Sequence, residues 1–224
     1  MRTYGQYCPI SRAAEVLAER WTLLVVRNLL LGCTTFTEIA HGVPAMSRSL
    51  LAQRLRALED AGVIETRRPR DRRATHYALT EAGRGLWDVV RPLAAWGERW
   101  LTLRPEHSDP SVVLWAWINF HLAHDALPAR RVVVQFDFPE QPPAHRRFWV
   151  LFQRSGAEIC YAPPGLPIDL AVKAGSEALT RWHVGAIEWR DAVRSGAIQV
   201  TGPPALARAL PTWNRRAVVA APRS

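Results

Sequence analysis

The clearest alternation of apolar and polar positions lies between residues 47 and 62. Apolar side chains recur there every three or four residues, at Leu51, Leu55, Leu58 and Ala61. This spacing places them on one face of a helix. Ser47 is a favourable N-cap residue and Gly62 a favourable stop. The pattern therefore predicts an amphipathic helix between Ser47 and Gly62 whose leucine face is buried.

Polar side chains cover the opposite face of this predicted helix. At about 100° per residue, Ser49, Gln53 and Arg56 point away from the leucines, and Arg48 lies on a flank. Arginine and glutamine make paired hydrogen bonds to guanine and adenine edges in the DNA major groove, and a short serine allows close approach. We therefore expect a DNA-reading helix with the candidate contacts Ser47, Arg48, Ser49, Gln53 and Arg56.

A basic hairpin is predicted directly after this helix. Residues 63–66 and 75–79 favour strands, and Pro69 and Asp71 between them favour a turn. Residues 65–73 contain five arginines against two acids. Arginines on such a turn suit phosphate contacts or a narrow minor groove, and the candidates are Arg68, Arg70, Arg72 and Arg73. The alternative is a solvated charged loop, which the helix immediately upstream disfavours.

Three helices are predicted before the hairpin. Residues 13–32 form one apolar helix and residues 36–42 a short one, each ending at a glycine. With the DNA-reading helix and the hairpin, they make the order of a winged helix-turn-helix. Residues 80–103 predict a further helix with apolar residues along its length. Because a palindromic operator is read by two recognition helices, we assign this helix to a homodimer interface. Packing against its own domain is the alternative.

Three short motifs carry a resemblance to a known family. They are Cys8-Pro9, Arg20-Trp21-Thr22 and Leu79-Thr80-Glu81-Ala82-Gly83, in this order and spacing. With them, residues 5–104 resemble the HxlR family of bacterial transcription regulators, which is related to the MarR group. The family commonly has a lysine in a GGKW-like stretch where this chain has Arg20, preceded by the acidic Glu19. The resemblance implies a DNA-binding transcription regulator.

The cysteine in the first of these motifs is a candidate redox sensor. The resemblance implies this role for Cys8, since several HxlR relatives sense oxidants or electrophiles there. If a helix begins at Pro9, Arg12 lies one turn away and is placed to stabilise the Cys8 thiolate. The alternative is a small side chain buried in a dimer interface. Cys33 and Cys160 have no comparable context.

Chain length and a proline-containing break indicate two domains. The 224 residues exceed one winged helix and fit two domains of roughly 100 residues each. Residues 104–110 contain two prolines that end the preceding helix. We place a DNA-binding domain at 1–104, a linker at 105–110 and a second domain at 111–224. The formal charge is +6 before residue 105 and +3 after it, which favours nucleic-acid binding by the first domain.

The second domain is predicted to be α+β with a five-stranded sheet. Residues 132–138 alternate with the period of a strand that has one buried face. Further strands are expected at 148–153, 158–162, 168–174 and 197–202, and helices at 111–127, 176–182, 186–195 and 203–210.

Residues 168–210 resemble the sterol-carrier-protein type 2-like domain in their order of strands and helices. The resemblance implies an apolar cavity for lipids or other hydrophobic ligands, enclosed by one sheet and its covering helices. The candidate lining residues are large aromatic side chains: Trp115, Phe120, Phe136, Phe148, Phe152, Trp182 and Trp189. The alternative is that they fill an ordinary core, since cores and pockets have the same composition.

Several functional classes are excluded by what the sequence lacks. No apolar run reaches the roughly 20 residues of a membrane span, and residues 1–10 lack the apolar core of a signal peptide. Three widely spaced cysteines without a CxxC motif predict neither a disulfide framework nor a zinc site. Nucleophile-elbow and phosphate-loop motifs are absent. We therefore expect a cytoplasmic protein that is no enzyme and has no metal or cofactor.

These features predict a homodimeric repressor that binds double-stranded DNA and responds to a hydrophobic small molecule through its second domain. Two alternatives come from other classes. One is a thiol-based switch that acts through Cys8, and the other is a lipid carrier.

Overall fold

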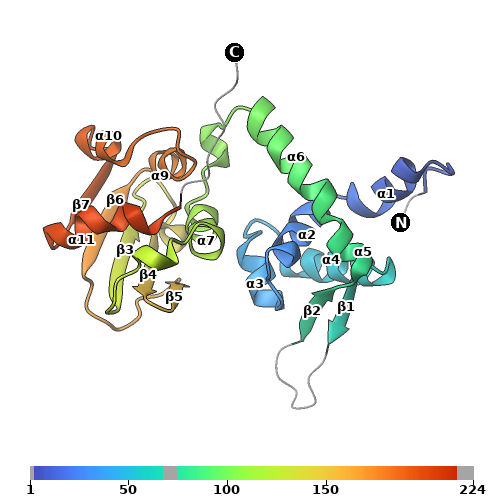
Figure 1. Ribbon diagram of the computed structural model, residues 1–224, viewed down its shortest axis with the longest axis horizontal. Coiled ribbons are helices and arrows are strands. Elements are labelled where there is room, and N and C mark those ends of the chain that lie inside the picture. Colours follow the sequence, from blue (N-terminus) through green and yellow to red (C-terminus); the bar gives the residue numbers. More distant parts are fainter. Residues whose placement is uncertain (1–2, 68–74, 216–224) are drawn as a thin grey trace. The chain divides into compact units, whose positions relative to one another are not determined.

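The computed structural model describes residues 3–67 and 75–215 and divides the chain into two compact units, Met1–Leu101 and Thr102–Ser224 (Figure 1). Each unit has its own hydrophobic core. Within the described residues, no helix combines the length and the apolar character that crossing a membrane requires.

The first unit has the element order of a winged helix-turn-helix, as predicted. Its elements are α1 (Pro9–Leu17), α2 (Thr22–Leu30), α3 (Phe36–His41), α4 (Arg48–Asp60), β1 (Ile64–Arg67), β2 (His76–Leu79), α5 (Glu81–Gly85) and α6 (Trp87–Trp100). Helix α2 packs against α3 and α4, and α4 packs against β1. Val26, Ile39 and Leu58 are fully buried where these helices meet. The apolar faces that the periodicity predicted therefore form the core of this unit.

The single helix expected over residues 13–32 is wrong. The chain forms two helices there, α1 and α2, separated by a turn that ends at Trp21. The backbone of Trp21 has a φ of 79°, in the left-handed region that costs an L-residue roughly 1–2 kcal/mol. Apolar periodicity continues across this turn, so the pattern gave no sign of the break.

Two side chains lock α2 to α3. The Asn28 side chain is fully buried, and its Nδ2 donates to the Ile39 carbonyl at 2.9 Å. Arg27 donates to Asn28 Oδ1 at 2.8 Å and to the Gly42 carbonyl at 2.7 Å. These bonds fix the end of α3 and therefore the turn that leads into α4.

The helix expected over residues 80–103 is also interrupted. It forms α5 and α6, joined at Leu86, and α6 ends at Trp100. The Thr80 hydroxyl accepts a hydrogen bond from the Gly83 amide at 3.1 Å, which caps α5, and donates to the Gly62 carbonyl at 2.7 Å. Gly83 lies so close to β1 that an added Cβ would come within 2.1 Å of the Val63 carbonyl oxygen. The Leu79–Gly83 motif thus joins α5 to the start of the hairpin.

The second unit is α+β with the five-stranded sheet that was predicted. Its elements are α7 (Pro110–Phe120), β3 (Val132–Asp137), α8 (Pro143–Arg146), β4 (Arg147–Gln153), β5 (Gly156–Cys160), β6 (Leu170–Ala174), α9 (Ser176–His183), α10 (Trp189–Arg194), β7 (Ile198–Thr201) and α11 (Pro204–Ala209), with short 3-10 turns at Pro105–His107, His124–Ala126 and Leu210–Trp213. The strand ends differ from the predicted ones by up to two residues. The strand order is β5-β4-β3-β6-β7, and β3 pairs with β6 in parallel while the other pairs are antiparallel.

Aromatic rings fill the core of the second unit. The ring of Trp117 lies with its centroid 5.1 Å from that of Trp182 and 5.5 Å from that of Phe152. Phe136 is 6.0 Å from Trp117, and all four residues are fully buried. Rings at these separations occupy the space between sheet and helices and contact one another there.

The helix expected over residues 111–127 is wrong beyond Phe120. Leu122 pairs with Asn214 in an isolated antiparallel bridge, and the Ala123 amide donates to the Trp213 carbonyl at 2.9 Å. The indole Nε1 of Trp117 donates to the same carbonyl at 3.0 Å. The chain leaves the helix because hydrogen bonds to a segment about ninety residues later replace the helical ones.

We expect Gly83→Ala to lower the free energy of unfolding by about 1 to 3 kcal/mol, the usual cost of overpacking. The new methyl group would meet the backbone of Val63, which has no rotamer to move into. Urea denaturation followed by circular dichroism measures the change. Gly85→Ala is the matched control, because an added Cβ there has no atom within 4 Å. Equal destabilisation by the two substitutions would contradict the packing role of Gly83.

Candidate nucleic-acid interface

Helix α4 separates an apolar face from a polar one. Leu51, Leu55 and Leu58 are at most 2% exposed and anchor the helix in the core. The five residues expected to contact DNA are all exposed: Ser47, Arg48, Ser49, Gln53 and Arg56. The structure thus brings these side chains together on the solvent face of one rigid helix.

The N-terminal end of α4 is ordered by its own side chains. The Ser47 hydroxyl accepts a hydrogen bond from the Leu50 amide at 3.3 Å and lies 3.2 Å from the Ser49 hydroxyl. The Arg48 guanidinium lies 4.9 Å from the centroid of the Phe36 ring, at the start of α3. A helix N-terminus with a nearby guanidinium favours anions, so this end of α4 suits a phosphate of the DNA backbone.

Arg54 positions α4, and the sequence reasoning missed it. Its Nη2 lies 2.9 Å from a carboxylate oxygen of Glu19, and its Nε donates to the Arg20 carbonyl at 3.2 Å. The Arg54 side chain is 15% exposed, whereas that of Glu19 is 53% exposed. The bond ties the middle of α4 to the turn between α1 and α2. The acidic Glu19, which departs from the HxlR pattern, was the available signal.

The hairpin beside α4 has the predicted strands, with β1 displaced by one residue and β2 beginning one residue later. Strands β1 and β2 pair from Ile64 with Leu79 to Arg67 with His76. The Tyr77 amide donates to the Thr34 carbonyl at 2.7 Å, which ties β2 to the segment before α3. Residues 68–74 lie outside the described residues, and with them the candidates Arg68, Arg70, Arg72 and Arg73. Their contacts with DNA stay a prediction.

Cys8 is the N-cap residue of α1 and is partly exposed. The backbone amides of Ser11 and Ile10, at the start of α1, lower the pKa of the Cys8 thiol below its ordinary value. The sequence suggested that Arg12 stabilises the Cys8 thiolate. Arg12 is not among the groups that lower the pKa of this thiol. Burial raises the pKa of Cys33 to about 11 and also raises that of Cys160. Cys8 is therefore the cysteine with the greatest thiolate character.

Large apolar side chains lie exposed along α6 and near α1. On α6 and just after it they are Trp87, Val89, Leu93, Trp96, Trp100 and Leu101, each 41% to 63% exposed. Around the start of α1, Tyr7 is 96% and Ile10 is 79% exposed. No residue of α6 is buried. A surface this apolar is typical of a site that another protein surface covers.

The aromatic residues that were expected to line a ligand cavity lie mainly in the core of the second unit. Phe136, Phe148, Phe152 and Trp182 are at most 2% exposed, and Trp115 is 4% exposed. Phe120 contacts the Trp115 ring edge-on at 4.8 Å, and Trp189 contacts Trp182 at 4.7 Å. These residues contact one another as a core does.

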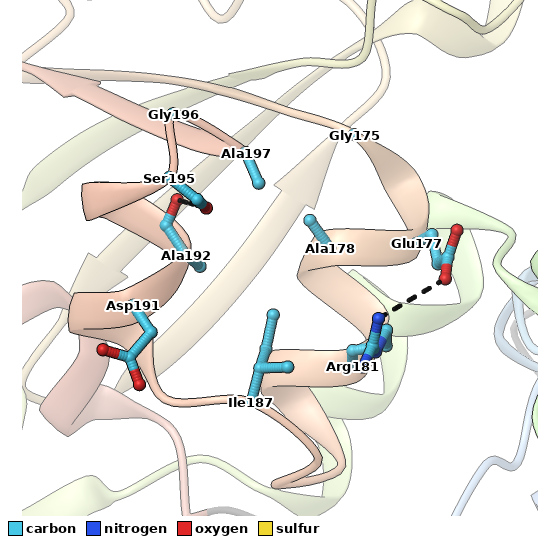
Figure 2. A pocket seen from close by; sticks show the side chains of 10 residues that line it. All are labelled: Gly175, Glu177, Ala178, Arg181, Ile187, Asp191, Ala192, Ser195, Gly196 and Ala197. Atoms are coloured by element: carbon cyan, nitrogen blue, oxygen red, sulfur yellow. Dashed lines mark hydrogen bonds and ion pairs between the residues drawn. The ribbon is translucent and has the colours of Figure 1, made fainter.

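A cavity of about 700 Å³ lies elsewhere in the second unit, between α9 and α10 (Figure 2). Ala178 and Ile187 face Ala192 across it, and Ala197 closes one end. Arg181 stands at the rim and pairs with Glu177 at 3.8 Å. Small apolar side chains therefore line the middle of this cavity, and the charged residues Glu177, Arg181 and Asp191 lie at its edges.

Comparison with known proteins gives the family. A model of the HxlR-like helix-turn-helix family matches residues 16–105. The uncharacterized HTH-type transcriptional regulator Rv3095 of Mycobacterium tuberculosis is 36% identical over 121 residues, which cover 46% of this chain and 73% of the relative. YvaP of Bacillus subtilis, an HTH-type transcriptional regulator, is 32% identical over 99 residues, which cover 43% of this chain and 92% of YvaP.

A solved structure, the reduced form of the transcriptional regulator YodB from B. subtilis, is 32% identical with a TM-score of 0.38 and covers 43% of this chain and 96% of YodB. The assignment rests on the family model and on the two sequence relatives. The chain belongs to the HxlR-like helix-turn-helix family of transcriptional regulators.

Proposed function

We propose that this transcriptional regulator binds double-stranded DNA as a homodimer, with α4 in the major groove and the β1–β2 hairpin on the flanking backbone. One observation carries the proposal, which is the exposed row of Ser49, Gln53 and Arg56 opposite a leucine face that is at most 2% exposed. Repression is the function proposed for the bound dimer, since a protein seated on promoter DNA blocks access to it.

The dimer is proposed from the exposed apolar residues of α6. A helix with no buried residue and with three half-exposed tryptophans gains little from its own unit. Burying such side chains stabilises by roughly 25 cal/mol per Å² of apolar surface, which favours association. Two copies related by a two-fold axis would present two α4 helices to successive turns of DNA.

Gln53→Ala and the pair Arg72→Ala with Arg73→Ala are expected to weaken DNA binding in different ways. Loss of Gln53, as a base contact, should relax sequence preference at a cost of roughly 1 to 3 kcal/mol. Loss of two tip arginines should weaken binding to all sequences and lower the log-log salt slope by about one unit per lost phosphate contact. Fluorescence anisotropy with matched and scrambled duplexes over a salt series measures both effects.

The control is Arg154→Ala, an exposed arginine of the second unit. It should change neither affinity nor salt slope. If the tip pair behaved like Arg154→Ala, the hairpin would have no role in DNA binding. If Gln53→Ala weakened all duplexes equally, α4 would not read bases.

A second function, thiol-based sensing at Cys8, is favoured by its place at the start of α1, where the backbone amides of Ser11 and Ile10 lower its pKa. The thiolate is the nucleophile in reactions with oxidants and electrophiles. Cys8 is the N-cap residue of α1, in the same region as the exposed Tyr7 and Ile10. If these residues belong to the dimer surface, a modified Cys8 changes the packing there and with it the spacing of the two α4 helices.

Alkylation of Cys8 by iodoacetamide should be faster than that of Cys33 or Cys160 at pH 7. Because its pKa is lowered, the Cys8 rate should reach its plateau at a lower pH than an ordinary thiol, whereas the raised pKa of Cys33 keeps that thiol protonated. Mass spectrometry of timed digests gives the three rates. Cys8→Ser should bind DNA and no longer respond to peroxide. An unchanged peroxide response in Cys8→Ser would remove this function.

We also propose that the second unit binds a hydrophobic small molecule that alters DNA affinity. The cavity between α9 and α10 supports this, because its volume of about 700 Å³ lies in the usual range of ligand sites. Its floor of Ala178, Ile187 and Ala192 is apolar. The sterol-carrier-like resemblance of this unit remains a prediction.

Decanoic acid and cholesterol, as probes of the full chain, should raise the unfolding temperature. A ligand at a hundredfold excess over its Kd adds about 2.7 kcal/mol to the stability of the native state. Ala197→Trp should abolish the shift by filling the cavity, and Gln199→Trp, on the neighbouring strand but outside the lining, should retain it. A shift without any change in DNA affinity would identify a lipid carrier instead of a sensor.

A further inference from the structure

A second cavity, of about 670 Å³ and open to solvent, lies on the surface of the first unit at the base of the hairpin. Its apolar wall comes from the end of α2 and from β2, and includes Leu29, Leu30, Cys33 and Leu79. Leu29 and Cys33 are buried at this wall. The side chains of Tyr77 on β2 and Trp87 on α6 add two aromatic surfaces. An aromatic ring fits such a wall, because flat apolar surfaces stack on one another.

The charges of this cavity are all of one sign. Arg67 of β1 and Arg84 of α5 line it, and none of the ten lining residues is acidic. Arg67 also pairs with Glu65 on its own strand, so its charge is partly compensated. Arg84 Nη1 donates to the Leu79 carbonyl at 2.8 Å, which holds the guanidinium at the cavity wall. Among the described residues, no carboxylate forms an ion pair with Arg84.

The thiol in the wall adds no opposing charge. Burial first, and then the charge of Glu38, raise the pKa of Cys33 to about 11, so the thiol is protonated near neutral pH. A neutral thiol in a buried wall behaves as a small apolar group. The cavity therefore offers an apolar surface with aromatic sides and a guanidinium, the complement of a planar molecule that carries one anionic group.

We propose that the cavity binds an aromatic carboxylate, with the ring against Leu30, Leu79 and the Tyr77 and Trp87 rings, and the carboxylate on Arg84. The ligand class follows from the lining. A guanidinium binds a carboxylate through paired N–H donors, and a purely inorganic anion leaves the apolar wall uncovered. The site is separate from the α9–α10 cavity and from Cys8.

The position of the cavity couples it to DNA binding. Tyr77, Leu79 and Arg67 belong to the two strands whose connection carries the predicted phosphate contacts, and Trp87 begins the helix of the proposed dimer surface. A ligand that contacts these strands has one affinity for the hairpin placement that suits DNA binding and another affinity for placements that do not. It therefore shifts operator affinity by the ratio of those two affinities. This coupling rests on the proposed function, whereas binding itself does not.

Isothermal titration calorimetry of the full chain with 1-naphthoate tests the site directly. The neutral analogue 1-naphthamide has the same ring and shape, and it should bind at least tenfold more weakly because it lacks the charge. Arg84→Gln should weaken naphthoate binding by about 10- to 100-fold, the usual loss for a charge-assisted hydrogen bond. Arg154→Gln, an exposed arginine in the second unit, should leave it unchanged.

A second variant guards against a folding defect in Arg84→Gln, whose unfolding temperature is measured alongside. Ala78→Leu leaves both arginines in place and reduces the volume of the cavity, because the larger side chain extends into it from β2. It should weaken the binding of 1-naphthoate, because the ring loses part of its space. Absence of naphthoate binding to the wild type would overturn the proposal. So would equal affinity for the amide, or full affinity in both Arg84→Gln and Ala78→Leu.

The same protein and probe then test regulation. Saturating 1-naphthoate should change operator affinity at least threefold, and operator DNA should change naphthoate affinity by the same factor. Naphthoate binding with unchanged operator affinity would overturn the coupling. If the chain bound naphthoate but no DNA of any sequence, this result would contradict the proposed DNA-binding function and still support the naphthoate site.

Discussion

Burial of one leucine face of α4 is the constraint on which the first unit depends. With Leu51, Leu55 and Leu58 held against α2 and β1, the rotation of α4 about its axis is set, and Gln53 and Arg56 must face solvent. Arg54 adds a polar anchor by reaching Glu19 and the Arg20 carbonyl. The strained Trp21 backbone belongs to the same turn, so the break between α1 and α2 supplies the partner that holds α4 in place. A base-reading helix needs this rigidity, because a rotation of one residue would exchange a reading side chain for a buried one.

Local patterns in the sequence predicted most of this unit and failed where long-range contacts decide. The leucine spacing of α4 and its Ser47 cap predicted both the helix and its exposed face, since both depend on neighbours along the chain. The break at Trp21 was missed because apolar periodicity continues through it. The place of α5 depends on Gly83 packing against Val63, and the end of α7 depends on pairing with Asn214. These contacts join residues that lie too far apart in the sequence for a local pattern to relate them. Arg54 was missed for the same reason, as its partner lies thirty-five positions away.

In the second unit, the alternation of apolar and polar residues predicted the strands, whereas residue type alone does not distinguish a core from a cavity wall. Phe136, Phe152 and Trp182 read equally well as a core or as a cavity wall, and the structure packs them against one another. The cavity between α9 and α10 is floored instead by alanines and a single isoleucine, residues too ordinary to attract notice in a sequence. The cavity at the base of the hairpin combines side chains from five elements, so it has no linear signature at all. Small side chains leave room for a ligand, whereas large ones fill it, and this distinction requires coordinates.

Selection of random DNA duplexes by the full chain, followed by sequencing of the bound pool, tests the central claim most directly. Two α4 helices brought together through α6 should recover an inverted repeat whose half-sites lie about 10 to 10.5 base pairs apart between centres, or a multiple of that distance. Recovery of a single asymmetric half-site, or of no enriched sequence, would contradict a dimer that reads bases through α4.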